Sequence, residues 1–362
     1  MGPVKLYVPE RYREPRLYSH IELLFPFWGI TVKESTPYVR AAFLQYQYSK
    51  NDFMLVEHID DAEYVVIPYP YFRLKETNPK MLAAIIQDAQ WTGKPLLIDG
   101  AGDIEHPINV EHSVVLRVSQ YSYSKRSNEL TVPFPAEDLL ETYAEGIPQL
   151  REKSEKPSVS FTGWASLSAQ MRLKLWIKEF PLTLAALFDE KRGAEHKGVF
   201  FREKVLTVLA KNPHIESHFK VRASYSGHLE TIEGSVKDNR KEFVKNILNS
   251  DYALCVKGDA NASVRFYEAL SLGRIPLFLD TSCVLPLEDK INYNEFCVFV
   301  DWRDTNRIDD ILMDFHKKIS PEQFKDMQRK ARDTYRNYFR SDAFSTHLAA
   351  DLRERETHFP HL

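Results

Sequence analysis

Residues 254–280 read LCVKGDANASVRFYEALSLGRIPLFLD. A short apolar run ends at Val256, and a polar loop with Gly258 and Asp259 follows it. An amphipathic stretch, a glycine and a second apolar run come next. This order predicts a strand, a loop, a helix and a second strand. Anionic ligands bind at such loop-to-helix junctions, because the first turn of a helix has backbone amides without partners inside the helix.

The expected helix has local signals at both ends. Asn261 or Ser263 would cap its N-terminus, because either side chain can accept a hydrogen bond from an unpaired amide. Gly273 lies where helices end in the left-handed conformation, and Pro276 soon after it prevents continuation. The apolar stripe of the helix would consist of Phe266, Ala269 and Leu270.

Three polar residues open this helix, namely Ser263, Arg265 and Glu268. Arg265 and Glu268 are three residues apart and therefore share a helix face. A hydroxyl and a guanidinium suit a diphosphate, and a carboxylate suits the two hydroxyls of a ribose. The alternative is an ordinary helix on which Arg265 and Glu268 pair with each other at the surface. The clustering of all three at the ligand-binding end of the helix favours a site.

The same string resembles the signature of the exostosin-like glycosyltransferases, glycosyltransferase family 47. The shared pattern is a Cys-x-x-x-Gly-Asp loop, then Ser-x-Arg-x-x-Asp/Glu-Ala on a helix, then Gly-x-Ile-Pro before a strand. The matching positions are Cys255, Gly258, Asp259, Ser263, Arg265, Glu268, Ala269, Gly273, Ile275 and Pro276. Arg274 stands where the family often has a cysteine. The specific match covers roughly 40 residues, with weaker similarity across residues 156–301.

The resemblance implies an α/β fold of the GT-B type, with two Rossmann-like domains and a cleft between them. We expect an acceptor-binding domain over residues 1–150 and a nucleotide-sugar-binding domain over residues 151–340. Residues 341–362 would form a C-terminal helix that crosses back to the first domain. Alternating strand and helix patterns in the first half agree with a mostly parallel sheet. The charged segment before Pro157 resembles a linker between domains.

The resemblance also implies an inverting transferase that moves a sugar from a nucleoside diphosphate donor, expected to be UDP-linked, to a hydroxyl of a glycan acceptor. Arg265 would stabilise the leaving diphosphate, and Glu268 would hold the ribose. No cofactor is expected, because the donor is itself a substrate. No metal ion is expected either, because no Asp-x-Asp pattern lies between strands, and Arg265 with the helix amides would take the place of a divalent ion. The expected donor-binding residues are Gly163, Arg222, Lys257, Gly258, Asp259, Ser263, Arg265 and Glu268.

An inverting transfer needs a general base for the acceptor hydroxyl. Residues 99–106, DGAGDIEH, follow an apolar run that predicts a buried strand. The loop supplies Asp103, Glu105 and His106, one of which we expect to be the base. The alternative is an ordinary turn in which Asp caps a helix and Gly serves the turn geometry.

Composition excludes several other functions. A net charge of −3 gives no support for a nucleic-acid partner. No stretch reaches the roughly 18 consecutive apolar residues of a membrane span, and the three cysteines are too few for a disulfide framework. We therefore expect a cytoplasmic protein without a transmembrane segment. The sequence has no Gly-x-Gly-x-x-Gly or Gly-Lys-Ser/Thr pattern and no His/Cys cluster at metal-binding spacing.

A second hypothesis is a catalytically silent glycosyltransferase-like subunit that binds glycan or supports a partner enzyme. Its basis is the vague match of the N-terminal half and the absence of one unambiguous base.

Overall fold

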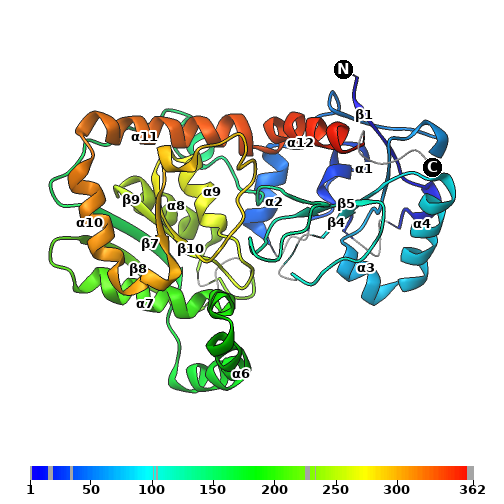
Figure 1. Cartoon of the computed structure of the whole chain (residues 1–362). Helices are drawn as coiled ribbons and strands as arrows, with labels where there is room; N and C mark the ends of the chain where they lie inside the picture. The colour runs from blue at the N-terminus through cyan, green and yellow to red at the C-terminus, as the bar shows by residue number, and fades with distance from the viewer. Residues whose placement is uncertain are drawn as a thin grey trace.

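The computed structural model describes residues 2–14, 19–32, 36–100, 102, 105–224, 229–232 and 234–356. Two parallel β-sheets, each accompanied by helices, lie side by side (Figure 1). The first half of the chain builds one sheet and the second half builds the other. The predicted α/β fold with two Rossmann-like domains, the GT-B arrangement, is thereby confirmed.

The first sheet has six strands in the order β2-β1-β3-β4-β5-β6, and all its pairings are parallel. Its strands are short and mostly buried, as expected when helices cover both faces of a parallel sheet. Their bounds are β1 Val4–Tyr7, β2 Phe53–Leu55, β3 Tyr64–Val66, β4 Leu96–Asp99, β5 Ser113–Arg117 and β6 Glu129–Thr131.

The second sheet has five strands in the order β11-β10-β9-β7-β8, again all parallel. Strand β9 lies before the signature loop that contains Gly258 and Asp259. Strand β10 begins after the helix that follows this loop. The bounds are β7 Ser158–Trp164, β8 Glu216–Arg222, β9 Tyr252–Cys255, β10 Ile275–Asp280 and β11 Val298–Asp301.

Twelve α-helices connect and cover the two sheets in the described part of the chain. Those of the first half are α1 Phe25–Trp28, α2 Pro37–Gln45, α3 Tyr71–Thr77, α4 Pro79–Thr92 and α5 Leu139–Tyr143. Those of the second half are α6 Ala169–Phe188, α7 Gly198–Lys211, α8 Val236–Leu248, α9 Val264–Ser271, α10 Ile308–Lys318, α11 Pro321–Thr334 and α12 Ser341–Glu356.

The last two helices connect the domains. Helix α11 runs along the second domain and α12 continues over the first, so the chain returns to the sheet where it began (Figure 1). The hydroxyl of Tyr64 in β3 donates to the carbonyl of Leu352 in α12 at 2.6 Å. Phe344 and Leu348 of α12 belong to one apolar core that also contains residues of β1 and α9. The division at residue 150 remains a prediction, although the strands of the two sheets fall on either side of it.

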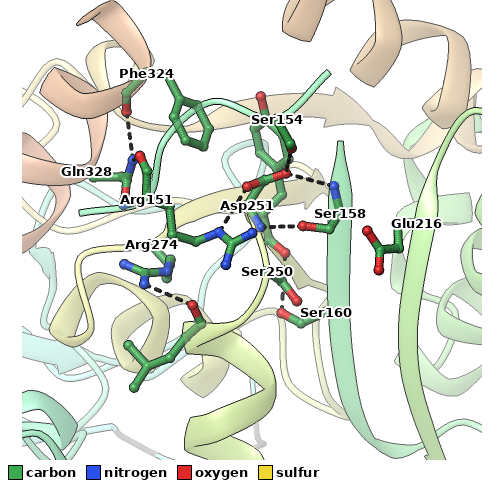
Figure 2. A network of polar contacts seen from close by, with 12 residues as sticks. Arg151, Ser154, Ser158, Ser160, Glu216, Ser250, Asp251, Arg274, Phe324 and Gln328 are labelled. Atoms are coloured by element: carbon green, nitrogen blue, oxygen red, sulfur yellow. Dashed lines mark hydrogen bonds and ion pairs between the residues drawn. The ribbon is translucent and has the colours of Figure 1, made fainter. Parts of the chain in front are cut away.

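A buried carboxylate organises the entry of the chain into the second domain (Figure 2). Asp251, directly before β9, has a fully buried side chain. It accepts hydrogen bonds from the Ser158 amide at 2.9 Å, from the Ser154 hydroxyl and from Arg151 Nε at 3.0 Å. The Arg151 amide in turn donates to Gln328 of α11 at 2.8 Å. This network ties the linker, β7, β9 and α11 together.

Burial raises the pKa of Asp251, but the hydrogen bonds from Ser154, Ser158 and Arg151 outweigh it and leave the pKa below its ordinary value. A carboxylate with a lowered folded-state pKa stabilises the fold above its unfolded-state pKa of about 3.9. That contribution is lost as the pH falls through the lower pKa of the folded state.

We predict that Asp251→Asn lowers the free energy of unfolding by about 2 kcal/mol or more near neutral pH, because a buried acceptor of several hydrogen bonds loses its charge. Chemical denaturation measures the loss. The matched control is Asp314→Asn on the exposed face of α10, which should change stability little. The difference between wild type and Asp251→Asn should shrink below about pH 4; an equal loss in both variants would contradict the role of Asp251.

Candidate functional site

A cavity of about 490 Å³ lies between the two domains. Strand ends of both sheets surround it: Val118 directly follows β5, Gly163 lies near the end of β7, and Val256 directly follows β9. The carboxyl ends of parallel strands are where ligands bind in such folds. The first domain contributes Tyr38, Val39, Val118 and residues 134–137, and the second contributes the rest of the wall.

Seven of the eight expected donor-binding residues line this cavity: Gly163, Arg222, Gly258, Asp259, Ser263, Arg265 and Glu268. They come from β7, β8, the signature loop and α9. The eighth, Lys257, is buried, and its ammonium donates to the Tyr121 hydroxyl and the Ala194 carbonyl, both at 2.7 Å. Burial lowers the pKa of Lys257 to about 8. Its side chain thus connects the domains, and it is not among the residues that line the cavity.

Arg265 lines the cavity without a carboxylate partner among the described residues. Its Nη2 donates to the Thr162 carbonyl at 2.7 Å, and its guanidinium lies over the Phe161 ring at 4.4 Å. Its Nε is buried and makes no hydrogen bond. Burial lowers the pKa of Arg265, but an arginine remains charged in a protein. A buried charged donor without a partner is costly, so this group favours an anion in the cavity.

Gly163 makes room for that guanidinium. Its φ of +152° lies in the region that side chains with a Cβ disfavour. A Cβ at this position would lie 2.9 Å from Arg265 Nη2. The space that a side chain would fill at Gly163 is therefore taken by the guanidinium of Arg265.

Arg265 and Glu268 do not pair with each other, which removes the alternative of an ordinary surface pair. Glu268 instead accepts from Arg240 Nη1 of α8 at 2.5 Å, and Arg240 Nε donates to Glu137 at 3.3 Å. All three side chains are less than a tenth exposed. The Arg240 guanidinium also lies 4.5 Å over the Tyr38 ring. One wall of the cavity is therefore a buried carboxylate–arginine–carboxylate row shared by both domains.

The start of α9 differs from the sequence expectation in one respect. Ser263 occupies the N-cap position, but its side chain makes no capping hydrogen bond. Asn261 does not cap the helix either, since its side chain amide donates to the carbonyls of Gln120 and Thr281. Tertiary contacts thus override the local capping preference. The Ser263 hydroxyl lies at the cavity, next to amides of the first helical turn that have no partner inside the helix.

The remaining charges of the cavity are already paired. Asp259 has a half-exposed side chain and forms an ion pair with Lys197 at 3.0 Å. Arg222 Nη2 lies 3.1 Å from Glu242, which also pairs with Lys220. Both pairs are exposed enough to rearrange at small cost when a ligand binds.

Sequence reasoning did not assign three charged residues of the cavity wall to the site: Glu137, Arg202 and Arg240. Arg202 of α7 donates to the carbonyls of Trp164 at 3.2 Å and Lys257 at 2.8 Å, so it links the β7 turn to the signature loop. Arg240 lies on α8, the helix directly before β9, whereas Glu137 and Arg202 come from segments farther from the signature. Only the fold brings the three side chains to one cavity wall.

The described residues of the expected base loop are not among those that line the cavity. Glu105 accepts hydrogen bonds from the Ser119 hydroxyl and from the Asn261 amide, the latter at 2.9 Å, and so supports the signature loop. His106 is exposed, and its carbonyl accepts from Arg117 at 2.7 Å. Asp103 lies outside the described residues. The identity of the base stays a prediction.

Two searches of the described residues gave negative results. No group of three or more His, Cys, Asp or Glu side chains there is arranged to hold a metal ion. No helix there combines the length and apolar character needed to cross a membrane.

Comparison with known sequences places the signature in a defined domain. The exostosin GT47 domain model matches residues 182–315, which include α8, β9, α9 and β10. The chain is 30% identical over 118 residues to the exostosin-1 homolog of Caenorhabditis elegans, which covers 32% of this chain and 30% of that protein.

Two plant proteins match similar or shorter stretches. A probable glycosyltransferase of Arabidopsis thaliana is 32% identical over 126 residues, covering 33% of this chain and 24% of that protein. A probable glucuronosyltransferase of Oryza sativa subsp. japonica is 39% identical over 70 residues, covering 19% of this chain and 16% of that protein. The match thus spans at most 30% of the length of any of these three relatives.

Solved structures align over most of the chain but only loosely. TarM aligns with a TM-score of 0.37 and 10% identity, covering 89% of this chain and 57% of that chain. Sucrose-phosphate synthase from Thermosynechococcus elongatus aligns with a TM-score of 0.38 and 14% identity, covering 99% of this chain and 100% of that chain. Alignments with TM-scores this low carry no argument about the fold, which rests on the two parallel sheets. The signature helix therefore lies in a region that matches the exostosin GT47 domain, and over this region the chain is similar to exostosin-like glycosyltransferases.

Proposed function

We propose that the chain transfers a sugar from a UDP-sugar to a glycan hydroxyl with inversion at the anomeric carbon, and without a metal ion. The observation that carries this proposal is Arg265, whose buried Nε makes no hydrogen bond while the residue lines the interdomain cavity. A diphosphate would supply the missing acceptor. The amides at the start of α9 would supply further donors.

The remaining polar groups suit the other parts of a nucleotide sugar. Glu268 is positioned on α9 beside Arg265 and would exchange part of its contact with Arg240 for the ribose hydroxyls. Phe134 and Phe243 give the cavity apolar walls that suit the flat faces of a base or a sugar. Ser263 would donate its hydroxyl to a phosphate oxygen.

The transfer itself is a single displacement. The acceptor oxygen forms a bond to the anomeric carbon while the bond to the diphosphate oxygen breaks, and the hydroxyl proton passes to a base. Arg265 and the amides neutralise the charge that develops on the leaving diphosphate. Glu105 or His106 would have to approach the cavity to act as the base, because neither lines it, and the acceptor would enter from the first domain.

The role of Glu268 can be tested with UDP and 2′-deoxy-UDP in the presence of EDTA. We predict that wild-type protein binds UDP more tightly than 2′-deoxy-UDP, by about tenfold or more for a hydrogen bond to a carboxylate. Glu268→Gln should weaken UDP binding and abolish that preference. Isothermal titration calorimetry measures both affinities.

The matched control is Glu137→Gln, which removes the other carboxylate from Arg240 without touching the proposed ribose contact. It should retain the preference for UDP over 2′-deoxy-UDP. If both variants behave alike, Glu268 acts only as a partner of Arg240, and the ribose assignment is wrong. If EDTA abolishes UDP binding by wild-type protein, the metal-independent donor site is wrong.

The role of Arg265 is tested by turnover. We predict that Arg265→Ala lowers the rate of UDP release from a UDP-sugar by about 100-fold or more, because a donor to the leaving group is lost. Arg222→Ala is the control, since Arg222 lines the same cavity but is already paired with Glu242. The Arg222→Ala variant should lose less of the rate of UDP release. Near-normal turnover of Arg265→Ala would contradict the assignment.

A second candidate function is a silent subunit that binds nucleotide sugar or glycan without transfer. It is favoured by one observation, namely that neither Glu105 nor His106 lines the cavity. UDP binding with no release of UDP from any donor, in the presence of mixed glycan acceptors, would support this candidate over the transferase.

A further inference from the structure

Helix α6 stands apart from the rest of the molecule. Figure 1 shows it projecting below α7, away from both sheets. One of its faces is anchored: Glu179 is buried, with its carboxylate 2.8 Å from His196 Nδ1, and it accepts from the Lys197 amide at 3.1 Å. The partly buried Leu175 and Leu182 lie four residues before and three after it, on the same face.

The opposite face is apolar and open. Eight of the fifteen exposed large hydrophobic side chains among the described residues belong to this one helix. Seven of them repeat at helical spacing and form one stripe opposite Glu179. These are Leu173, Trp176, Ile177, Phe180, Leu184, Leu187 and Phe188. Trp176 is 56% exposed, and Phe188, at the end of the stripe, is 93% exposed. A contiguous exposed stripe of this kind marks a binding surface.

Unpaired cations border this apolar stripe. Lys174 and Lys178 are exposed at its edge, and neither forms an ion pair with a described residue. Arg172 differs, because it forms a bidentate pair with Glu203 of α7. Glu179, the sole carboxylate of the helix, is held on the inner face. The open surface of α6 is therefore apolar at its centre and positive at its edge.

We propose that α6 binds flat on an anionic lipid bilayer, with its apolar stripe among the acyl chains and Lys174 and Lys178 at the phosphate headgroups. Helices with a Trp- and Leu-rich face bordered by lysines bind membranes in this orientation, and anionic headgroups complement the two free cations. A second copy of the chain fits less well, because pairing these stripes would bring no carboxylate of either helix to the lysines.

The position of α6 connects this surface to the cavity. Trp164, which lines the cavity, is separated from the start of α6 by residues 165–168. The N-terminal end of α6 is therefore joined to the cavity wall by a short segment of chain. The proposal does not rest on the proposed transferase activity, since membrane binding is measured without a donor or an acceptor.

Flotation of the full chain with vesicles tests the proposal. The protein should float with phosphatidylcholine vesicles that contain phosphatidylglycerol and much less with phosphatidylcholine alone. Replacing Trp176→Glu and Ile177→Glu together should abolish flotation, because charges would enter the acyl region. Lys174→Gln with Lys178→Gln should weaken partitioning into anionic vesicles by about tenfold or more. Unchanged binding of either double variant would overturn the proposal.

The matched control is Trp91→Glu on α4, which alters a tryptophan that is 79% exposed but lies in the first domain. It should float like wild type, and unchanged melting temperatures would show that all variants fold. Analytical ultracentrifugation without lipid tests whether a second copy of the chain covers the stripe instead of a bilayer. A dimer that Trp176→Glu with Ile177→Glu converts to monomer would assign the stripe to a second copy and overturn membrane docking, as would equal flotation with neutral vesicles.

Discussion

The buried pairing of Arg240 with Glu137 and Glu268 is the interaction on which the site depends. Burial alone would lower the pKa of Arg240, but Glu268 and Glu137 outweigh it and leave the pKa above its ordinary value. Glu137 belongs to the first domain and Glu268 to α9, so one guanidinium fixes the width of the cleft at this point. Removing one partner of such a row typically costs about 3–5 kcal/mol, because a buried charge is left uncompensated.

The second arginine of the site, Arg265, differs from Arg240 in every respect that matters for a ligand. Arg240 has two carboxylate partners, whereas Arg265 has one carbonyl and an aromatic face, and its Nε has no partner. The cleft therefore combines a wall whose charges are paired with each other and a cation that has no carboxylate partner among the described residues. This contrast gives an anion one preferred position, next to α9 and the β7 turn, where Gly163 leaves room for the guanidinium.

Local pattern predicted the elements around the signature well. The strand before the loop, the helix over residues 264–271, the left-handed Gly273 with φ +62° and the strand from Ile275 all appear in the structure. These features depend on neighbours in the sequence, so short-range patterns reveal them. The predicted side-chain cap is wrong for both candidates: Ser263 occupies the N-cap position without a capping hydrogen bond, and Asn261 is held by Gln120 and Thr281 from distant segments. The same kind of contact directs Lys257 toward Tyr121 of the other domain.

The sequence by itself determined the alternation of strands and helices and the signature helix, because both follow from periodicity and from residue spacing within a few turns of chain. Its resemblance to glycosyltransferase family 47 implied the two-domain arrangement. Only the tertiary structure decided that Arg240 and Glu137 share a wall with Glu268, that Arg265 Nε has no hydrogen-bond partner among the described residues, and that the stripe on α6 stays exposed. Each of these features depends on residues that are distant in the chain. An apolar helix face has the same sequence pattern whether the fold covers it or leaves it exposed.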